Sequence, residues 1–227
     1  MQGRAAETID SAINKQDITL WSEVIERAIS TVYNFAHKAF LQVLPTASNL
    51  HQWKKLKDPQ CTLCKKGLPQ TNKHVLSNCS SPAALQRYTE RHNAILQHVV
   101  RWLKSVTSAS QKVFTDIGDE HNNSTKYLFH TYRPDIAICN DSEVKVLELT
   151  ICHETNLNNS KTYKLNKYRE LASCLTPEAT GKQVTCHTIE VSTLGFISPC
   201  DEYIDANRLP RMQKELKKAI IRDVLNY

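Results

Sequence analysis

Four side chains that commonly bind metals lie close together in the first half of the chain. Cys61 and Cys64 are separated by two residues, nine residues lie between Cys64 and His74, and four lie between His74 and Cys79. Thiolates and imidazole are ligands that tetrahedral Zn²⁺ prefers. Because protein ligands would fill all four positions, the spacing predicts a structural zinc knuckle and not a catalytic zinc site. The alternative is four unrelated residues in a chain with eight cysteines.

Basic residues surround this group of ligands. Six lysines lie within it or just before it: Lys54, Lys55, Lys57, Lys65, Lys66 and Lys73. Clustered lysines are typical of surfaces that contact nucleic-acid phosphates. Lys65, Lys66 and Lys73 are therefore candidate nucleic-acid-binding residues, and a solvated surface without a ligand is the alternative.

Two acidic residues in the second half are candidates for a different metal site. Asp135 follows Pro134, and twelve residues separate it from Glu148. Both acids lie in predicted strands joined by a short polar turn, so a hairpin would bring their carboxylates together. Oxygen ligands suit Mg²⁺ or Mn²⁺. The flanking residues are apolar, and a buried carboxylate is costly unless it is paired or bound to a metal. The alternative for Asp135 is an ordinary turn residue.

A helix expected over residues 161–175 follows these strands and could supply a cation to the acids. Lys164 and Tyr168 are four residues apart, so both would project from one helix face. Lys164 is therefore the first candidate for a catalytic lysine, and Lys167 is the second.

The elements that position these residues follow from the pattern of apolar residues. From Thr19 to Leu44 apolar residues recur every three or four positions, which predicts one long helix ended by Pro45. Ser81 and Pro82 are typical of a helix start, and the second helix should run to about Val106. We further expect strands over 113–115, 132–139, 144–152 and 183–193, a turn over 119–124, and a closing helix over 209–225.

These elements predict an α+β protein. A helical N-terminal part with a zinc knuckle of the Cys-Cys-His-Cys type should precede an α/β domain. The expected division is a helical linker region over 1–58, the knuckle over 59–82, a connecting helix over 83–110 and the α/β domain over 111–227.

The composition excludes fibrous and low-complexity classes of protein. Of the 227 residues, 41% are hydrophobic and 23% are charged. The net charge of +6 weakly favours a polyanionic partner. No apolar run is long enough to span a membrane, so no membrane partner is expected. The polar first ten residues do not read as a secretory signal, so we expect a reducing compartment and unpaired thiols.

The order of these motifs resembles the C-terminal end of the polyprotein of site-specific non-LTR (LINE-type) retrotransposons. These elements carry a restriction-like endonuclease after the reverse transcriptase, and the resemblance covers nearly the whole chain. The residues that carry it are Leu44 to Leu50, the knuckle, Arg91-His92-Asn93, Arg133-Pro134-Asp135 and Lys164 to Tyr168. The resemblance implies a PD-(D/E)xK endonuclease fold over 111–227. In the usual motif a lysine lies two residues after the second acid, where this chain has Thr150, and this subgroup tends to show that departure.

What the resemblance implies is a Mg²⁺- or Mn²⁺-dependent DNA endonuclease that nicks target DNA for target-primed reverse transcription in the nucleus. Asp135 and Glu148 match the metal-binding acids, Lys164 and Tyr168 match the catalytic lysine and tyrosine, and Arg133 matches a basic residue that contacts phosphate. The implied partners are target DNA, the element RNA and the reverse transcriptase part of the same polyprotein. Two alternatives are a non-catalytic nucleic-acid-binding module and a degenerate, inactive nuclease.

Overall fold

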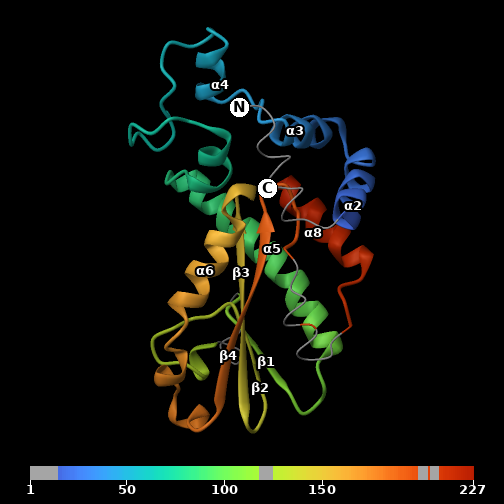
Figure 1. Ribbon diagram of the computed structural model, residues 1–227, viewed down its shortest axis with the longest axis vertical. Coiled ribbons are helices and arrows are strands. Elements are labelled where there is room, and N and C mark those ends of the chain that lie inside the picture. Colours follow the sequence, from blue (N-terminus) through green and yellow to red (C-terminus); the bar gives the residue numbers. More distant parts are fainter. Residues whose placement is uncertain (1–14, 118–124, 199–203, 205–209) are drawn as a thin grey trace.

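The computed structural model describes residues 15–117, 125–198, 204 and 210–227, with side chains from residue 18 onward. It is a mixed α+β fold with a helical N-terminal part and a four-stranded sheet (Figure 1). The main helices are α2 (Lys15–Glu26), α3 (Ser30–Phe40), α4 (Ala47–Gln52), α5 (Pro82–Val106), α6 (Leu157–Lys167) and α8 (Lys214–Asn226). The strands are β1 (Lys112–Thr115), β2 (Ile136–Cys139), β3 (Glu143–Cys152) and β4 (Gln183–Ser192). Shorter turns of helix are η1 (His74–Asn78), Thr125–Tyr127, Glu154–Asn156, Leu171–Cys174 and Pro177–Ala179.

The sheet has the order β1-β2-β3-β4 and is covered on both faces. β1, β2 and β3 pair antiparallel, whereas β4 runs parallel to β3. Apolar residues of α5 and α8 share one buried cluster with Leu147 and Leu149 of β3. Val144 and Val146 belong to a second cluster on the other face. Figure 1 shows α6 on one side of the sheet and α5 and α8 on the other.

This two-sided burial fixes where Glu148 lies. Side chains alternate between the faces of a strand, so Glu148 shares its face with Val144 and Val146. That face is covered by α6, the helix that carries Lys164. The acid and the lysine are therefore on the same side of the sheet.

The single long helix expected from Thr19 to Leu44 is wrong, because the chain breaks into α2 and α3 at residues 27–29. In one straight helix Trp21 and His37 would lie about 24 Å apart along the axis. Instead their ring centroids are 6.0 Å apart. The break lets both helices place apolar residues in one cluster with Phe196 and Leu225 of the C-terminal half. Tertiary packing decides where the helix breaks, and the spacing of apolar residues along the sequence does not indicate it.

Most other expected elements are confirmed with shifted ends. α5 begins at Pro82, and the Ser81 side chain accepts a hydrogen bond from the N–H of Ala84. β2 begins only at Ile136. The helix expected over 161–175 starts earlier, at Leu157, and ends at Lys167. The closing helix begins at Lys214, and the turn expected over 119–124 lies outside the described residues.

The helical N-terminal part packs against the C-terminal half. Leu20 and Ile25 of α2, Leu76 of η1 and Leu225 of α8 lie in one buried cluster. The division of the chain into four parts stays a prediction. Within the described residues, no helix combines the length and apolar character needed to cross a membrane.

Gly195 lies in the turn after β4, where only glycine fits well. Its φ is +89°, and a Cβ atom there would lie 2.9 Å from the Cα of Ile221 in α8. Gly195→Ala is expected to lower the free energy of unfolding by about 2–4 kcal/mol, through the left-handed backbone and the overlap together. Gly181, with φ +84° and nothing within 4 Å of its Cβ position, is the matched control. Gly181→Ala should cost only about 1–2 kcal/mol. Equal losses in urea unfolding would contradict the role of the overlap.

Candidate functional site

The Cys61, Cys64, His74 and Cys79 side chains converge at one point. Their ligand atoms all lie within 4.8 Å of one another. Cys61 Sγ is 3.9 Å from Cys79 Sγ, and Cys64 Sγ is 3.5 Å from His74 Nε2. Thiolates about 2.3 Å from a tetrahedral zinc would lie about 3.8 Å apart. The cluster can therefore hold a metal ion such as zinc.

A tight hairpin and one short helical turn bring these ligands together. The N–H of Cys61 donates to the carbonyl of Leu68 at 2.8 Å. Between them Lys65 and Gly67 have φ of 52° and 66°, left-handed values that reverse the chain direction. The π-helical turn η1 then begins at His74 and ends just before Cys79.

The environment of Cys61 favours the thiolate that metal binding requires. Burial raises the pKa of this thiol, but the backbone N–H groups of Cys64 and Leu63 outweigh it and hold the pKa at about 6. The side-chain amide of Gln70 also donates to Cys61 Sγ, at 3.6 Å. A thiol that loses its proton this readily fits a zinc ligand.

Helix α5 holds the knuckle through three hydrogen bonds. The hydroxyl of Tyr88 donates to the carbonyl of Val75 at 2.7 Å and accepts from the N–H of Cys79 at 3.2 Å. The buried guanidinium of Arg91 donates to the carbonyl of Leu76 at 2.9 Å. These bonds fix η1, which supplies His74, against the N-terminal half of α5.

The run Leu44 to Leu50 has a structural role beside the knuckle. The Thr46 hydroxyl accepts from the N–H of Asn49 and so caps α4. The Asn49 side chain donates to the carbonyls of Gln42 and Leu44, at 2.9 and 2.7 Å. These bonds fix the turn that joins α3 to α4.

Asp135 and Glu148 lie opposite each other at the start of the β2–β3 hairpin. Ile136 pairs with Leu147, so Asp135 and Glu148 are the next pair along the same register. The N–H of Asp135 donates to Glu148 Oε1 at 3.0 Å, and the N–H of Leu149 donates to Asp135 Oδ2 at 2.9 Å. Each acid is therefore held by the backbone next to the other.

Lys164 completes this acidic site. Its Nζ donates to Glu148 Oε2 at 2.6 Å from the adjacent helix α6. The Glu148 side chain is 1% exposed, and that of Asp135 is 17% exposed. Two desolvated carboxylates and one ammonium thus meet at the edge of the core, and oxygen donors of this kind suit Mg²⁺ or Mn²⁺.

The charges in this site shift one another's protonation. Burial raises the pKa of Asp135, but His92, Lys164 and the N–H of Leu149 together hold it below its usual value. Burial and the Asp135 charge raise the pKa of Glu148, and Lys164 only partly opposes this. The Glu148 carboxylate raises the pKa of Lys164 despite burial. Lys164 is therefore an ammonium at neutral pH.

Tyr168 and Lys167 lie next to this site. Tyr168 is buried, and its ring centroid is 5.9 Å from Lys164 Nζ and 4.8 Å from Lys167 Nζ. Burial and the nearby Glu148 carboxylate raise the pKa of the Tyr168 hydroxyl, so it stays protonated. Lys167 Nζ donates to that hydroxyl at 3.3 Å. The structure thus brings Lys164 to the acids and places Lys167 against Tyr168.

Three of the four predicted nucleic-acid-binding residues are lysines of the knuckle segment, and they differ in exposure. Lys65 and Lys66 are exposed on the knuckle hairpin. Lys73 is half-buried, and its Nζ donates to Asn156 Oδ1 at 2.8 Å. It therefore links the knuckle to the start of α6.

Arg133 lies just before Asp135, where the sequence predicted it, but it already has an acidic partner. Its Nε and Nη2 donate to Asp116 Oδ1, at 3.1 and 2.5 Å. The Arg133 side chain is 54% exposed. Solvent screens such an exposed pair, so the guanidinium could exchange Asp116 for a phosphate at little cost.

Sequence reasoning named one further residue of the acidic site only within the run Arg91-His92-Asn93 and gave it no role. His92 of α5 places its Nε2 3.5 Å from Asp135 Oδ2 and its Nδ1 3.3 Å from Asn93 Oδ1. Although burial lowers the pKa of His92, the contact with Asp135 raises it above its usual value. The available signal was helical spacing, since His92 lies three and four residues before Ile95 and Leu96, which face the sheet.

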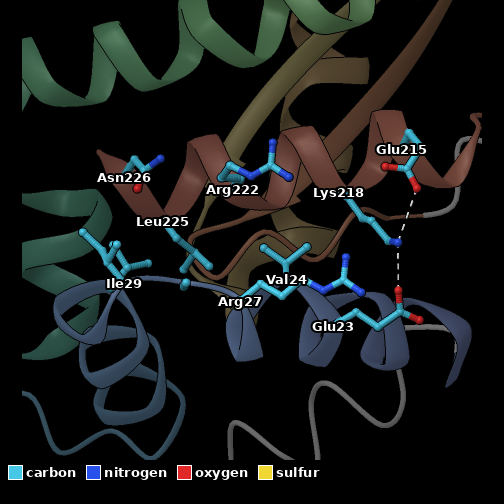
Figure 2. Close-up of a pocket in the computed structure, with 11 residues that line it drawn as sticks. Glu23, Val24, Arg27, Ile29, Glu215, Lys218, Arg222, Leu225 and Asn226 are labelled. Carbon is cyan, nitrogen blue, oxygen red and sulfur yellow. Dashed lines mark hydrogen bonds and ion pairs between the residues drawn. The ribbon is translucent and has the colours of Figure 1, made fainter.

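A cavity of about 460 Å³ lies elsewhere, between α2, the start of α3 and α8 (Figure 2). Arg27 and Arg222 contribute to its lining. Lys218 pairs there with Glu23 at 2.8 Å and Glu215 at 3.3 Å, as Figure 2 shows. None of its lining residues belongs to the zinc cluster or the acidic site, so this cavity takes no part in the chemistry considered below.

Known proteins give no family for this arrangement. No model of a protein family matches the chain, and a search of the curated proteins finds no match either.

Proposed function

We propose that this chain is a divalent-metal-dependent DNA endonuclease that nicks one strand. The observation that carries the proposal is the convergence of Asp135, Glu148 and Lys164, in which Lys164 Nζ lies 2.6 Å from Glu148 Oε2. Two acids on a hairpin with an ammonium from the next helix match the expectation drawn from the PD-(D/E)xK resemblance. The specific endonuclease fold belongs to the same proposal.

The reaction is hydrolysis of a phosphodiester. Water attacks phosphorus, the bond from phosphorus to O3′ breaks, and the leaving oxygen takes a proton to become a 3′ hydroxyl. Asp135 and Glu148 would hold a Mg²⁺ or Mn²⁺ ion, which when bound supplies positive charge against the charge that develops on the phosphate oxygens. No residue of the zinc cluster is needed for this step.

Lys164 acts here as a hydrogen-bond donor. Because the Glu148 carboxylate raises its pKa, the Lys164 ammonium keeps its proton at neutral pH and is a donor in this structure. Its ammonium is suited to orient the attacking water or to stabilise the phosphate oxygens. Tyr168 is buried, and its ring centroid lies 5.9 Å from Lys164 Nζ, so it would help to position that ammonium.

The nick would serve target-primed reverse transcription, in which its 3′ hydroxyl primes the polymerase. This part of the proposal rests on the resemblance, as do the element RNA, the reverse transcriptase partner and the nuclear location. The exposed Lys65 and Lys66 would contact nucleic-acid phosphates. The zinc knuckle would hold these two lysines in place.

Nicking of supercoiled plasmid tests the proposal. We expect open-circular product with Mg²⁺ or Mn²⁺ and none with EDTA. Asp135→Asn should lower the rate by at least about 10²-fold, because it removes a charge that binds the metal. Asp141→Asn is the matched control, since Asp141 is exposed in the turn of the same hairpin. Nicking that persists unchanged in Asp135→Asn would overturn the proposal.

A second candidate is a nucleic-acid-binding module without catalysis, a category that includes a degenerate nuclease. The ion pair between Lys164 and Glu148 favours it, because the lysine satisfies the acid without a metal. This candidate predicts that wild-type protein retards DNA in gel shifts but never nicks it, with either divalent ion.

A further inference from the structure

We infer that His92 is a positioning residue for Asp135 and that the zinc knuckle sets its place. The inference rests on the proposed nuclease site and extends it to a residue on α5, outside the hairpin and α6. It assigns the knuckle a part in organising the acidic site as well as in contacting nucleic acid.

The contact itself is specific to one carboxylate oxygen. His92 Nε2 lies 3.5 Å from Asp135 Oδ2, the oxygen that also accepts from the N–H of Leu149. The N–H of Leu149 and the imidazole of His92 thus both restrain this oxygen. Asp135 Oδ1, the other oxygen, then keeps a constant direction toward the space where the metal would bind. A ligand held in this way binds metal more tightly than one that rotates freely.

The position of His92 depends on the knuckle through its neighbour in the helix. Arg91 is 5% exposed and donates to the carbonyl of Leu76 in η1. One turn earlier, Tyr88 bonds to Val75 and to the N–H of the zinc ligand Cys79. The knuckle is therefore hydrogen-bonded to α5 at Tyr88 and at Arg91, the residue next to His92.

A second contact ties the knuckle to the other side of the acidic site. Lys73 Nζ, next to the ligand His74, donates to Asn156 Oδ1 at 2.8 Å. Asn156 is the N-cap residue just before α6, and α6 carries Lys164. The helix that carries His92 and the helix that supplies the ammonium thus both contact the knuckle segment.

The test replaces His92 and measures nicking, metal affinity and stability in the full chain. His92→Leu keeps a similar size without a donor, and His92→Gln keeps a donor. His98→Leu is the matched control, because His98 lies on the same helix and pairs with Asp223 at 2.8 Å. The metal probe is Mn²⁺ alone, titrated by calorimetry, and melting temperature reports stability.

His92→Leu is expected to weaken Mn²⁺ binding and to lower kcat, each by about 10–100-fold. The KM for DNA should stay within about twofold of the wild-type value, because His92 would act through Asp135 and not by contacting DNA. His92→Gln should recover most of the loss. His98→Leu should lower only the melting temperature, which separates positioning from a general loss of stability.

The outcomes distinguish this inference from the proposed function. If wild-type protein nicks DNA and His92→Leu behaves like it, the inference is overturned and the nuclease stands. If wild-type protein does not nick, the proposed function fails, and the Mn²⁺ titration still decides. The role of His92 is overturned if the Mn²⁺ affinity is unchanged in His92→Leu. It is also overturned if the wild-type protein does not bind Mn²⁺. If His92→Leu does not fold, loss of Mn²⁺ affinity in Tyr88→Phe supports the inference, and unchanged affinity there overturns it.

Discussion

Glu148→Gln is expected to lower the nicking rate by about 10³-fold or more, the largest effect of any single change in the acidic site. The substitution keeps the shape of the side chain and removes its charge. It therefore takes away a metal ligand and also the partner that orients Lys164, whose Nζ lies 2.6 Å from Glu148 Oε2. Rates of plasmid nicking at saturating Mg²⁺ measure this effect.

The same change should also destabilise the fold, because it leaves the Lys164 ammonium without its carboxylate. Losing one partner of a buried pair costs several kcal/mol. The Lys164 side chain is 21% exposed, and the substitution also relieves the burial cost and the Asp135 repulsion that raise the pKa of Glu148. We therefore expect a loss of at most about 1–3 kcal/mol. Adding Lys164→Met should restore most of that stability in urea unfolding while leaving nicking at background.

This pair of measurements separates chemistry from packing. An inactive double variant of normal stability shows that the charges serve the reaction and not the fold. If the double variant regains nicking along with stability, the catalytic roles of Glu148 and Lys164 are wrong.

Removal of zinc is expected to cause the largest loss of stability. Structural zinc binding contributes about 10–16 kcal/mol in isolated finger peptides, where binding and folding are one event. Cys79 is 1% exposed at the centre of the cluster, and its N–H is bonded to Tyr88. Cys79→Ser should therefore abolish zinc retention, unfold the knuckle and free the N-terminal half of α5. Zinc content by mass spectrometry and urea unfolding measure the two effects.

Cys174→Ser is the matched control for the zinc experiment, since Cys174 is a partly buried cysteine outside the cluster. It should leave zinc content unchanged and move stability by less than about 1 kcal/mol. If a zinc chelator leaves the unfolding curve of the wild-type protein unchanged, the assignment of four zinc ligands is wrong.

The sequence predicts best what short-range chemistry decides. The knuckle spacing found all four members of the observed cluster, because a loop of nine residues limits where its ends can meet. Ser81 and Pro82 located the start of α5, since a helix cap needs only its neighbours. The polar turn after Cys139 gave the hairpin, and the hairpin register then placed Asp135 opposite Glu148.

What the sequence could not give depends on contacts between distant segments. The break between α2 and α3 follows from packing on Phe196 and Leu225, far along the chain. The same holds for His92, which meets Asp135 only because α5 lies across the sheet. The choice between Lys164 and Lys167 depends on which face of α6 turns toward the hairpin.

The placement of the two acids at the open end of the β2–β3 hairpin bears on how related chains can be recognised. Residues added at the tip, between Asn140 and Ser142, leave the Asp135–Glu148 pair opposed, whereas a single residue lost within β3 sends one acid to the wrong side of the sheet. The number of residues between the two acids can therefore increase at the hairpin tip, but it cannot change within the paired strands. A pattern with a flexible gap and strict flanks would find distant members that a fixed count of twelve overlooks.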